Sequence, residues 1–67
     1  MNGTKRMEIK TGDYVKIVLK ENQRTGWLTD GYVKDILTKF PEHKHGIKVR
    51  LETGEIGRVK EIFKDLL

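Results

Sequence analysis

The sequence contains no cysteine, no alanine and no serine, and it has a single proline. Without cysteine the chain can form neither a disulfide framework nor a cysteine metal site, which is consistent with a reducing interior. Cysteine and serine nucleophiles are excluded for the same reason. The lack of alanine, beside seven glycines and many β-branched residues, disfavours a helical bundle and favours short strands joined by turns.

Long apolar runs are absent as well. The opening residues lack the apolar core of a signal peptide, and no segment approaches the ~18 apolar residues that span a bilayer. We therefore expect a soluble, cytoplasmic protein with no membrane contact. The sequence also lacks a phosphate-binding loop, a dinucleotide fingerprint and paired carboxylates with an evident pocket, and a domain this small lacks room for a cleft of ~300 Å³. We expect no enzyme activity and no cofactor.

What the sequence does contain is charge. Fourteen Lys and Arg against ten Asp and Glu give a formal net charge of +4. In a single domain spanning residues 1–67, this excess favours association with anionic partners such as nucleic acid. The alternative is a solvated, lysine-rich surface that only keeps the protein soluble. Residues 1–8, which include Lys5 and Arg6, are expected to form a loose basic arm.

The stretch 46–60 carries the clearest pattern. Aliphatic and charged residues alternate from Ile47 to Glu52, which predicts a strand with an apolar inner face and a charged outer face. A turn at Thr53–Gly54 would return the chain as a hairpin, because glycine can supply a positive φ. Since Ile56 and Val59 are three residues apart, we expect a bulge at Gly57–Arg58 that turns both inward.

Two more strands are predicted before this hairpin. The first covers Tyr14–Lys20, with Val15, Ile17 and Leu19 on the core side and a mixed second face. The second covers Gly31–Thr38, and a bulge at Lys34–Asp35 would let Val33 and Ile36 both point inward. Bulges of this kind supply the strong coiling that closes a small barrel.

The connecting segments complete the predicted fold. Glu21–Asp30 is either an ordered functional loop or a distorted hairpin, and residues 40–45 form a loop around the proline. Apolar residues at helical intervals in Lys60–Leu67 predict a short helical turn that plugs the barrel. The expected fold class is all-β, a small SH3-like barrel of four to five bent strands with a short C-terminal helical turn. An OB-type barrel, the nearest alternative, usually needs more residues and a longer helix.

Long segments of the chain resemble the YwbE-like family of small, uncharacterised microbial proteins. The segments that carry the resemblance are Gln23–Gly26, Leu28–Thr29, Gly31, Val33–Thr38, His45–Leu51, Gly54 and Gly57–Val59. The opening Met-Asn-Gly-Thr-Lys-Arg is similar too, so the resemblance covers nearly the whole chain. This chain departs from the family pattern at Tyr14 and Trp27, where polar residues are more usual, and in a longer C-terminal tail. The resemblance implies a family and no activity.

Shorter motifs resemble the SH3-like and KOW-type barrels of ribosomal and translation proteins. These motifs are Gly12–Ile17, Gly31–Val33 and Val49–Gly54. Modules of this kind often bind RNA and sometimes bind proteins, so the resemblance implies RNA binding linked to translation, by analogy of fold.

The candidate nucleic-acid-binding residues lie on the outer face of the 46–60 hairpin and in two loops. Lys48 and Arg50 would stand about 7 Å apart on one strand face, close to the spacing of successive phosphates. The alternative is an ordinary charged face that Glu52 and neighbouring acids neutralise. Arg24 can contact phosphate or guanine, or instead hydrogen-bond loop carbonyls. The full set is Arg24, Trp27, Lys34, His43, Lys44, His45, Lys48, Arg50, Arg58 and Lys60.

Two residue types in this set have alternative interpretations. Trp27, the single tryptophan, either stacks on a base or caps the core. His43 and His45, with Glu42, are too few and too close in sequence to enclose zinc, so no metal site is expected. The histidines are instead expected to order the turn before Gly46 or to contact nucleic acid.

The predicted function is a monomeric nucleic-acid-binding module that contacts mainly phosphates. RNA is the favoured partner, associated with translation or the ribosome, and DNA is possible. The alternative is a protein-interaction module that docks through a barrel edge or through an aromatic rim containing Tyr14 and Tyr32.

Overall fold

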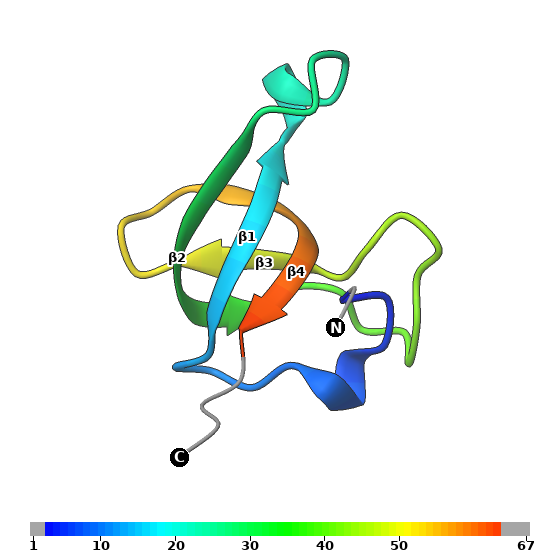
Figure 1. Cartoon of the computed structure of the whole chain (residues 1–67). Helices are drawn as coiled ribbons and strands as arrows, with labels where there is room; N and C mark the ends of the chain where they lie inside the picture. The colour runs from blue at the N-terminus through cyan, green and yellow to red at the C-terminus, as the bar shows by residue number, and fades with distance from the viewer. Residues whose placement is uncertain (1–2, 64–67) are drawn as a thin grey trace.

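Four strands make up the fold in the computed structural model, which describes residues 3–63. They are β1 (Tyr14–Leu19), β2 (Leu28–Ile36), β3 (Lys48–Leu51) and β4 (Ile56–Phe63). Each strand pairs antiparallel with the next, and β4 pairs with β1 to close a barrel (Figure 1). Two 3-10 turns, η1 (Arg6–Glu8) and η2 (Lys20–Asn22), lie on either side of β1. The chain is all-β, a small closed barrel of four strands that is compatible with the expected SH3-like architecture.

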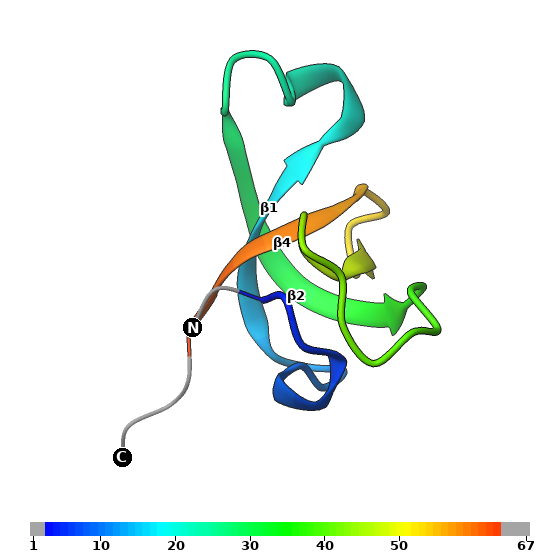
Figure 2. The same ribbon diagram turned by 90° about the vertical axis from the view of Figure 1, so that its right-hand side faces the viewer.

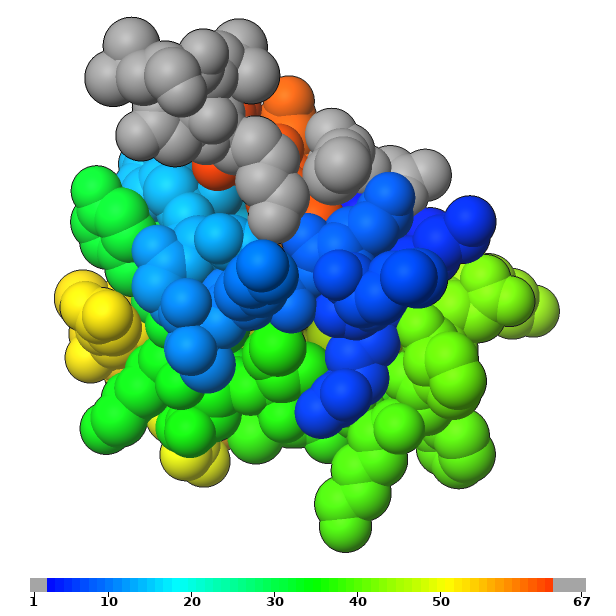
Figure 3. All heavy atoms as spheres, turned by 90° about the horizontal axis from the view of Figure 1, so that it is seen from below, coloured from blue at the N-terminus to red at the C-terminus, as the bar shows by residue number. Residues whose placement is uncertain are grey.

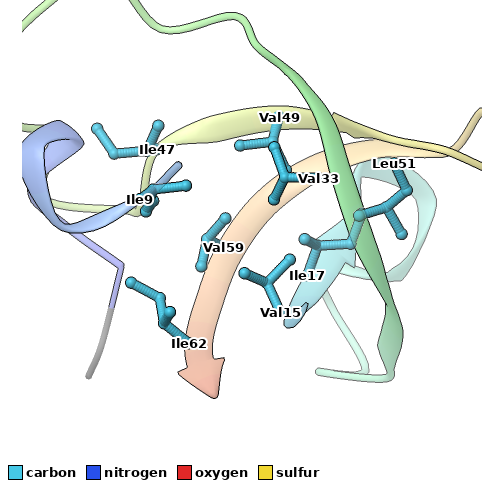
Figure 4. Close-up of a cluster of buried hydrophobic side chains, with 9 residues drawn as sticks. All are labelled: Ile9, Val15, Ile17, Val33, Ile47, Val49, Leu51, Val59 and Ile62. Atoms are coloured by element: carbon cyan, nitrogen blue, oxygen red, sulfur yellow. The ribbon is translucent and has the colours of Figure 1, made fainter. Parts of the chain in front are cut away.

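The core is a single cluster of aliphatic side chains that point toward the barrel axis (Figure 4). Its members are Ile9, Val15, Ile17, Val33, Ile47, Val49, Leu51, Val59 and Ile62. The alternation predicted for β3 is confirmed, because Ile47, Val49 and Leu51 are all fully buried. Burial of each such side chain stabilises the fold by roughly 1.5–3 kcal/mol, so a core this small depends on every member.

The strand β2 confirms one predicted bulge and corrects both predicted boundaries, because it ends at Ile36 and not at Thr38. Its pairing with β3 shifts register between Val33 and Asp35, as predicted, and Ile36 packs against the core cluster. β2 begins at Leu28, three residues before the predicted start, because residues 28–32 pair with β1. The remaining connection, with η2 at its start, projects from one end of the barrel (Figures 1 and 2).

The bulge predicted at Gly57–Arg58 is wrong. β4 pairs regularly with β3 there, Gly57 faces the core, and the Ile56 side chain points outward and is exposed. The irregularity lies in the pairing with β1 instead, where Ile17 faces Val59 while Lys16 faces Glu61. The extra residue is therefore at position 60, and it brings Ile62 back to the inside.

The helical turn predicted for Lys60–Leu67 is wrong over its first half, because β4 continues to Phe63. The rest of that prediction, residues 64–67, lies outside the described residues. The three-residue spacing of Val59 and Ile62 results from the β4 bulge and not from a helix. The helical segments of the described chain are the two short turns, and neither is long and apolar enough to cross a membrane.

The N-terminal segment also differs from the expected loose arm, because Gly3–Glu8 is hydrogen-bonded to the loop before β3 (Figure 3). The Arg6 N–H donates to the Pro41 carbonyl at 2.7 Å, and the His43 N–H donates to the Thr4 carbonyl at 2.8 Å. The Ile47 N–H donates to the Gly3 carbonyl at 2.8 Å. The segment then places Ile9 in the core, so it is part of the barrel.

Gly57→Ala tests the closure of the barrel. A Cβ at Gly57 would lie 2.4 Å from the Val18 carbonyl oxygen, so β1 and β4 would have to separate. We expect a loss of about 1–3 kcal/mol in the free energy of unfolding, measured by urea denaturation. The matched control is Gly31→Ala, whose added Cβ meets a Leu51 methyl at 2.9 Å and no backbone. Equal stability losses in the two variants would contradict this account.

Candidate nucleic-acid interface

One band of side chains crosses the outer faces of all four strands. Lys48 on β3 stands opposite Arg58 on β4, Arg58 stands opposite Val18 on β1, and Val18 stands opposite Leu28 on β2. The band is therefore basic at one end and aliphatic at the other. Two cations directly opposite each other destabilise a sheet unless an anion lies between them.

This band runs through two adjoining hollows, of about 810 and 420 Å³, which share Val18, Gln23 and Arg58. We call the two hollows together the basic groove. Its lining residues are Val18, Lys20, Gln23, Gly26, Leu28, His43, His45, Lys48, Ile56, Gly57, Arg58 and Lys60. Four of them are Lys or Arg, and among residues 3–63 no carboxylate lines the groove. The expectation that so short a chain leaves no room for a cleft is wrong.

The wall formed by the histidine loop is held in place by the β4 cations. The Arg58 Nη1 donates to the Gly46 carbonyl at 3.1 Å, and the Lys60 Nζ donates to the His45 carbonyl at 3.0 Å. Gly46 permits this close approach, because its φ is +104° and a Cβ there would lie 2.3 Å from the Val59 carbonyl oxygen. Guanidinium and ammonium groups carry several N–H donors, so both cations can still face a ligand.

His43 lies in this wall in an environment that disfavours its charged form. Partial removal from water lowers the pKa of His43 below its ordinary value of 6.5, and the positive charges of Arg58, His45 and Lys44 lower it further. The His43 Nδ1 also accepts a hydrogen bond from the His45 N–H at 3.1 Å, which requires that nitrogen to be unprotonated. His43 is therefore neutral at pH 7.

Arg50 differs from Lys48, although both point outward from β3 as predicted. The Arg50 Nη1 lies 3.1 Å from the Asp35 Oδ2, and this is the one ion pair within 4 Å among residues 3–63. The β2 bulge creates the pair, because it places Asp35 opposite Arg50. Both side chains are more than 40% exposed, so the pair adds little stability, but it neutralises the charge of Arg50. For Arg50, the pair favours the alternative of an ordinary charged face, with Asp35 as the neutralising acid.

The other predicted residues divide into two groups. Lys48, Arg58, Lys60, His43 and His45 come together in the basic groove. Arg24, Trp27 and Lys34 do not line it. Lys44 lines a third hollow with Thr4 and the carboxylate of Glu42, which adjoins the groove at His43 and His45.

Trp27 does not cap the core. It is 71% exposed on the projecting connection, and its backbone N–H donates to the Thr25 hydroxyl at 3.3 Å. The interpretation that Trp27 caps the core is therefore wrong, and stacking on a base stays a prediction.

Sequence reasoning missed Lys20 and Gln23, which line the groove from the start of the projecting connection. It also missed the groove's apolar floor, formed by Val18, Leu28 and Ile56. The one available signal was the apolar residue on the outer face of the first strand, Val18, which interrupts an otherwise polar row.

A second outward-facing cluster is aromatic. The Tyr14 ring lies 5.1 Å from Tyr32 and 5.6 Å from Phe63, and the Lys16 ammonium lies 5.5 Å from the centre of the Phe63 ring. The Tyr14 hydroxyl donates to Asp30. These contacts explain the aromatic residue at position 14 as local packing. Within residues 3–63, no three His, Asp or Glu side chains are grouped so that they could hold a metal ion.

Fold and site together define a class of protein, a small closed β-barrel with a basic groove on its outer face. The family model described as "Uncharacterized conserved protein (DUF2196)" matches residues 2–62. "Uncharacterized protein YwbE" of Bacillus subtilis (strain 168) is 61% identical over 62 residues, which cover 92% of this chain and 95% of that protein. The chain therefore belongs to the DUF2196 family, and its resemblance to YwbE-like proteins is confirmed. No solved structure matches the chain.

The lowered pKa of His43 makes a prediction about stability. Because the folded pKa lies below that of the unfolded chain, the unfolded state takes up protons more readily. The stabilising effect of neutral His43 should be complete above the unfolded pKa of about 6.5 and should be lost as the pH falls through the folded pKa. Between pH 7.5 and pH 5, the free energy of unfolding measured by urea denaturation should therefore fall more steeply for the natural protein than for the His43→Gln variant. If the free energy of unfolding falls equally with pH in both proteins, the pH dependence cannot be assigned to His43.

Proposed function

We propose that this protein binds RNA through the basic groove, as a cytoplasmic module associated with the translation apparatus. The observation that supports this proposal is the groove itself, where Lys20, Lys48, Arg58 and Lys60 converge without a lining carboxylate in the described chain. Such a concentration of uncompensated cations in a concave surface attracts polyanions. Contacts to phosphate would dominate, so sequence selectivity should be weak.

The opposition of Lys48 and Arg58 favours a polyanion over a solvated surface. Placed across a strand pair, the two cations repel each other, and each would be more stable beside an acid. A phosphate between them removes this repulsion and adds charge-assisted hydrogen bonds to both. RNA supplies several phosphates in a row, which suits a groove with four cations better than an isolated anion does.

A second candidate function, docking of a protein, is supported by the aromatic cluster. Tyr32 is 53% exposed and Phe63 is 39% exposed, so the cluster presents apolar area to a partner. Docking along a free barrel edge has less support, since every described strand has a paired neighbour on both sides. The two candidate functions use different surfaces and can be tested separately.

RNA binding through this groove should depend steeply on salt. Four phosphate contacts predict a slope of about −3 in a plot of log K against log salt for single-stranded RNA, by analogy with DNA. Fluorescence anisotropy of labelled RNA between 25 and 200 mM salt measures this slope. Absence of binding to RNA and DNA at the lowest salt would rule out the proposed function.

Charge reversal at the groove should remove most of the binding. Lys20→Glu with Lys48→Glu eliminates two contacts and leaves the loop-anchoring Arg58 and Lys60 intact. Roughly 1 kcal/mol for each lost contact predicts about thirtyfold weaker binding.

The matched control is Lys10→Glu with Lys39→Glu, at two exposed lysines that line none of the hollows. Each Lys→Glu substitution lowers the formal net charge by two, so both double variants have a net charge of 0 in place of +4. If net charge alone governs binding, the two variants will weaken it equally, which contradicts a localised site. Thermal unfolding should be nearly unchanged in both, because all four lysines are exposed.

A further inference from the structure

The basic groove has an apolar floor as well as charged walls. Leu28 and Ile56 are each 39% exposed on the outer face of the barrel, and Val18 lies between their strands. Val18 and Arg58 line both hollows, whereas Leu28 lines only the larger one and Ile56 only the smaller one. Phosphates alone would leave these apolar side chains without a contact.

Double-stranded and unpaired RNA would use such a groove differently. A duplex buries the faces of its bases and offers phosphates and riboses at its surface, whereas an unpaired strand can turn its bases toward apolar side chains. Phosphates on the cations and a base on the floor would occupy both parts of the groove at once.

We propose, on the basis of the proposed function, that the groove binds an unpaired RNA segment. One base lies on Val18 and Leu28 in the larger hollow, and the adjacent phosphates lie between Lys48 and Arg58. The loop of a structured RNA provides such a segment, with bases free of their complement.

Two polar side chains lie where they can contact the edge of that base. Gln23 lines both hollows, and its amide both donates and accepts hydrogen bonds. His43 is half-buried in the opposite wall, where a neutral imidazole can stack on a base or hydrogen-bond to it. Phosphates on the nearby cations would weaken the positive field that lowers the His43 pKa.

The test compares four probes at one salt concentration. These are a single-stranded RNA octamer of mixed sequence, the same octamer paired with its complement, polyphosphate of matched charge, and polyglutamate of matched charge. Binding is followed by isothermal titration calorimetry, which detects binding at any part of the surface. We expect the single strand to bind at least about tenfold more tightly than the duplex or polyphosphate, which corresponds to one base seated on the floor.

Two variants locate the base. Leu28→Ser should weaken binding of the single strand about fivefold and leave polyphosphate binding unchanged, because it removes apolar contact and no charge. Gln23→Ala, at an exposed residue, should act in the same direction with the fold intact. The matched control is Met7→Ser, which removes an 83% exposed apolar side chain outside the groove.

The outcomes separate this inference from the proposed function. Equal binding of single strand and duplex, with Leu28→Ser and Gln23→Ala both neutral, would overturn the inference and leave RNA binding in place. Tight binding of polyglutamate, equal to that of RNA, would overturn both and indicate an acidic peptide as the ligand. Absence of binding to either RNA would also overturn both.

Discussion

The close contact between β4 and β1 determines the shape of this protein. At Gly57 the two strands approach so closely that an added Cβ would lie 2.4 Å from the Val18 carbonyl oxygen. This contact closes the barrel, and the extra residue at position 60 then returns Ile62 to the core. Because residues alternate along β4, the same register that buries Val59 turns Arg58 outward, between Lys48 and Val18. The core and the groove therefore depend on one strand pairing.

The N-terminal segment links the core to the groove in a second way. It contributes Ile9 to the apolar cluster, and its backbone binds the loop that carries the histidines. That loop is held from the other side by Arg58 and Lys60. A chain this short has no rigid scaffold separate from its functional loops, so the histidine wall is fixed by the same contacts that complete the barrel.

The sequence predicted the parts of the fold that follow from strict alternation. β3 follows from such alternation. The β2 bulge was predicted from the three-residue spacing of Val33 and Ile36, and the pairing with β3 confirms it. The apolar pattern of β4 was ambiguous, since three-residue spacings fit either a bulge or a helix. Only the pairing with β1 decides that the extra residue is Lys60, and that Gly57 occupies an inward position for lack of a side chain.

The sequence predicted which charged side chains face outward at the candidate site, but not which of them are neutralised by a neighbouring acid. Lys48, Arg58 and Lys60 follow from alternation along β3 and β4, but the pairing of Arg50 with Asp35 requires the register between two strands. Lys20 and Gln23 likewise line the groove only because the start of the projecting connection lies near β4 residues in the folded chain. Long-range pairing decides both cases, and local pattern contains no information about it.

The difference between Arg50 and Arg58 shows how the barrel distributes its charge. Arg50 meets a carboxylate, whereas Arg58 meets a carbonyl, a lysine on the neighbouring strand and a histidine in the groove wall. His43 responds to this environment, because desolvation and then the charge of Arg58 lower its pKa. The positive field that disfavours a proton at His43 favours an anion at the same place. The groove thus presents a positive potential beside His43, which strengthens contact with a phosphate.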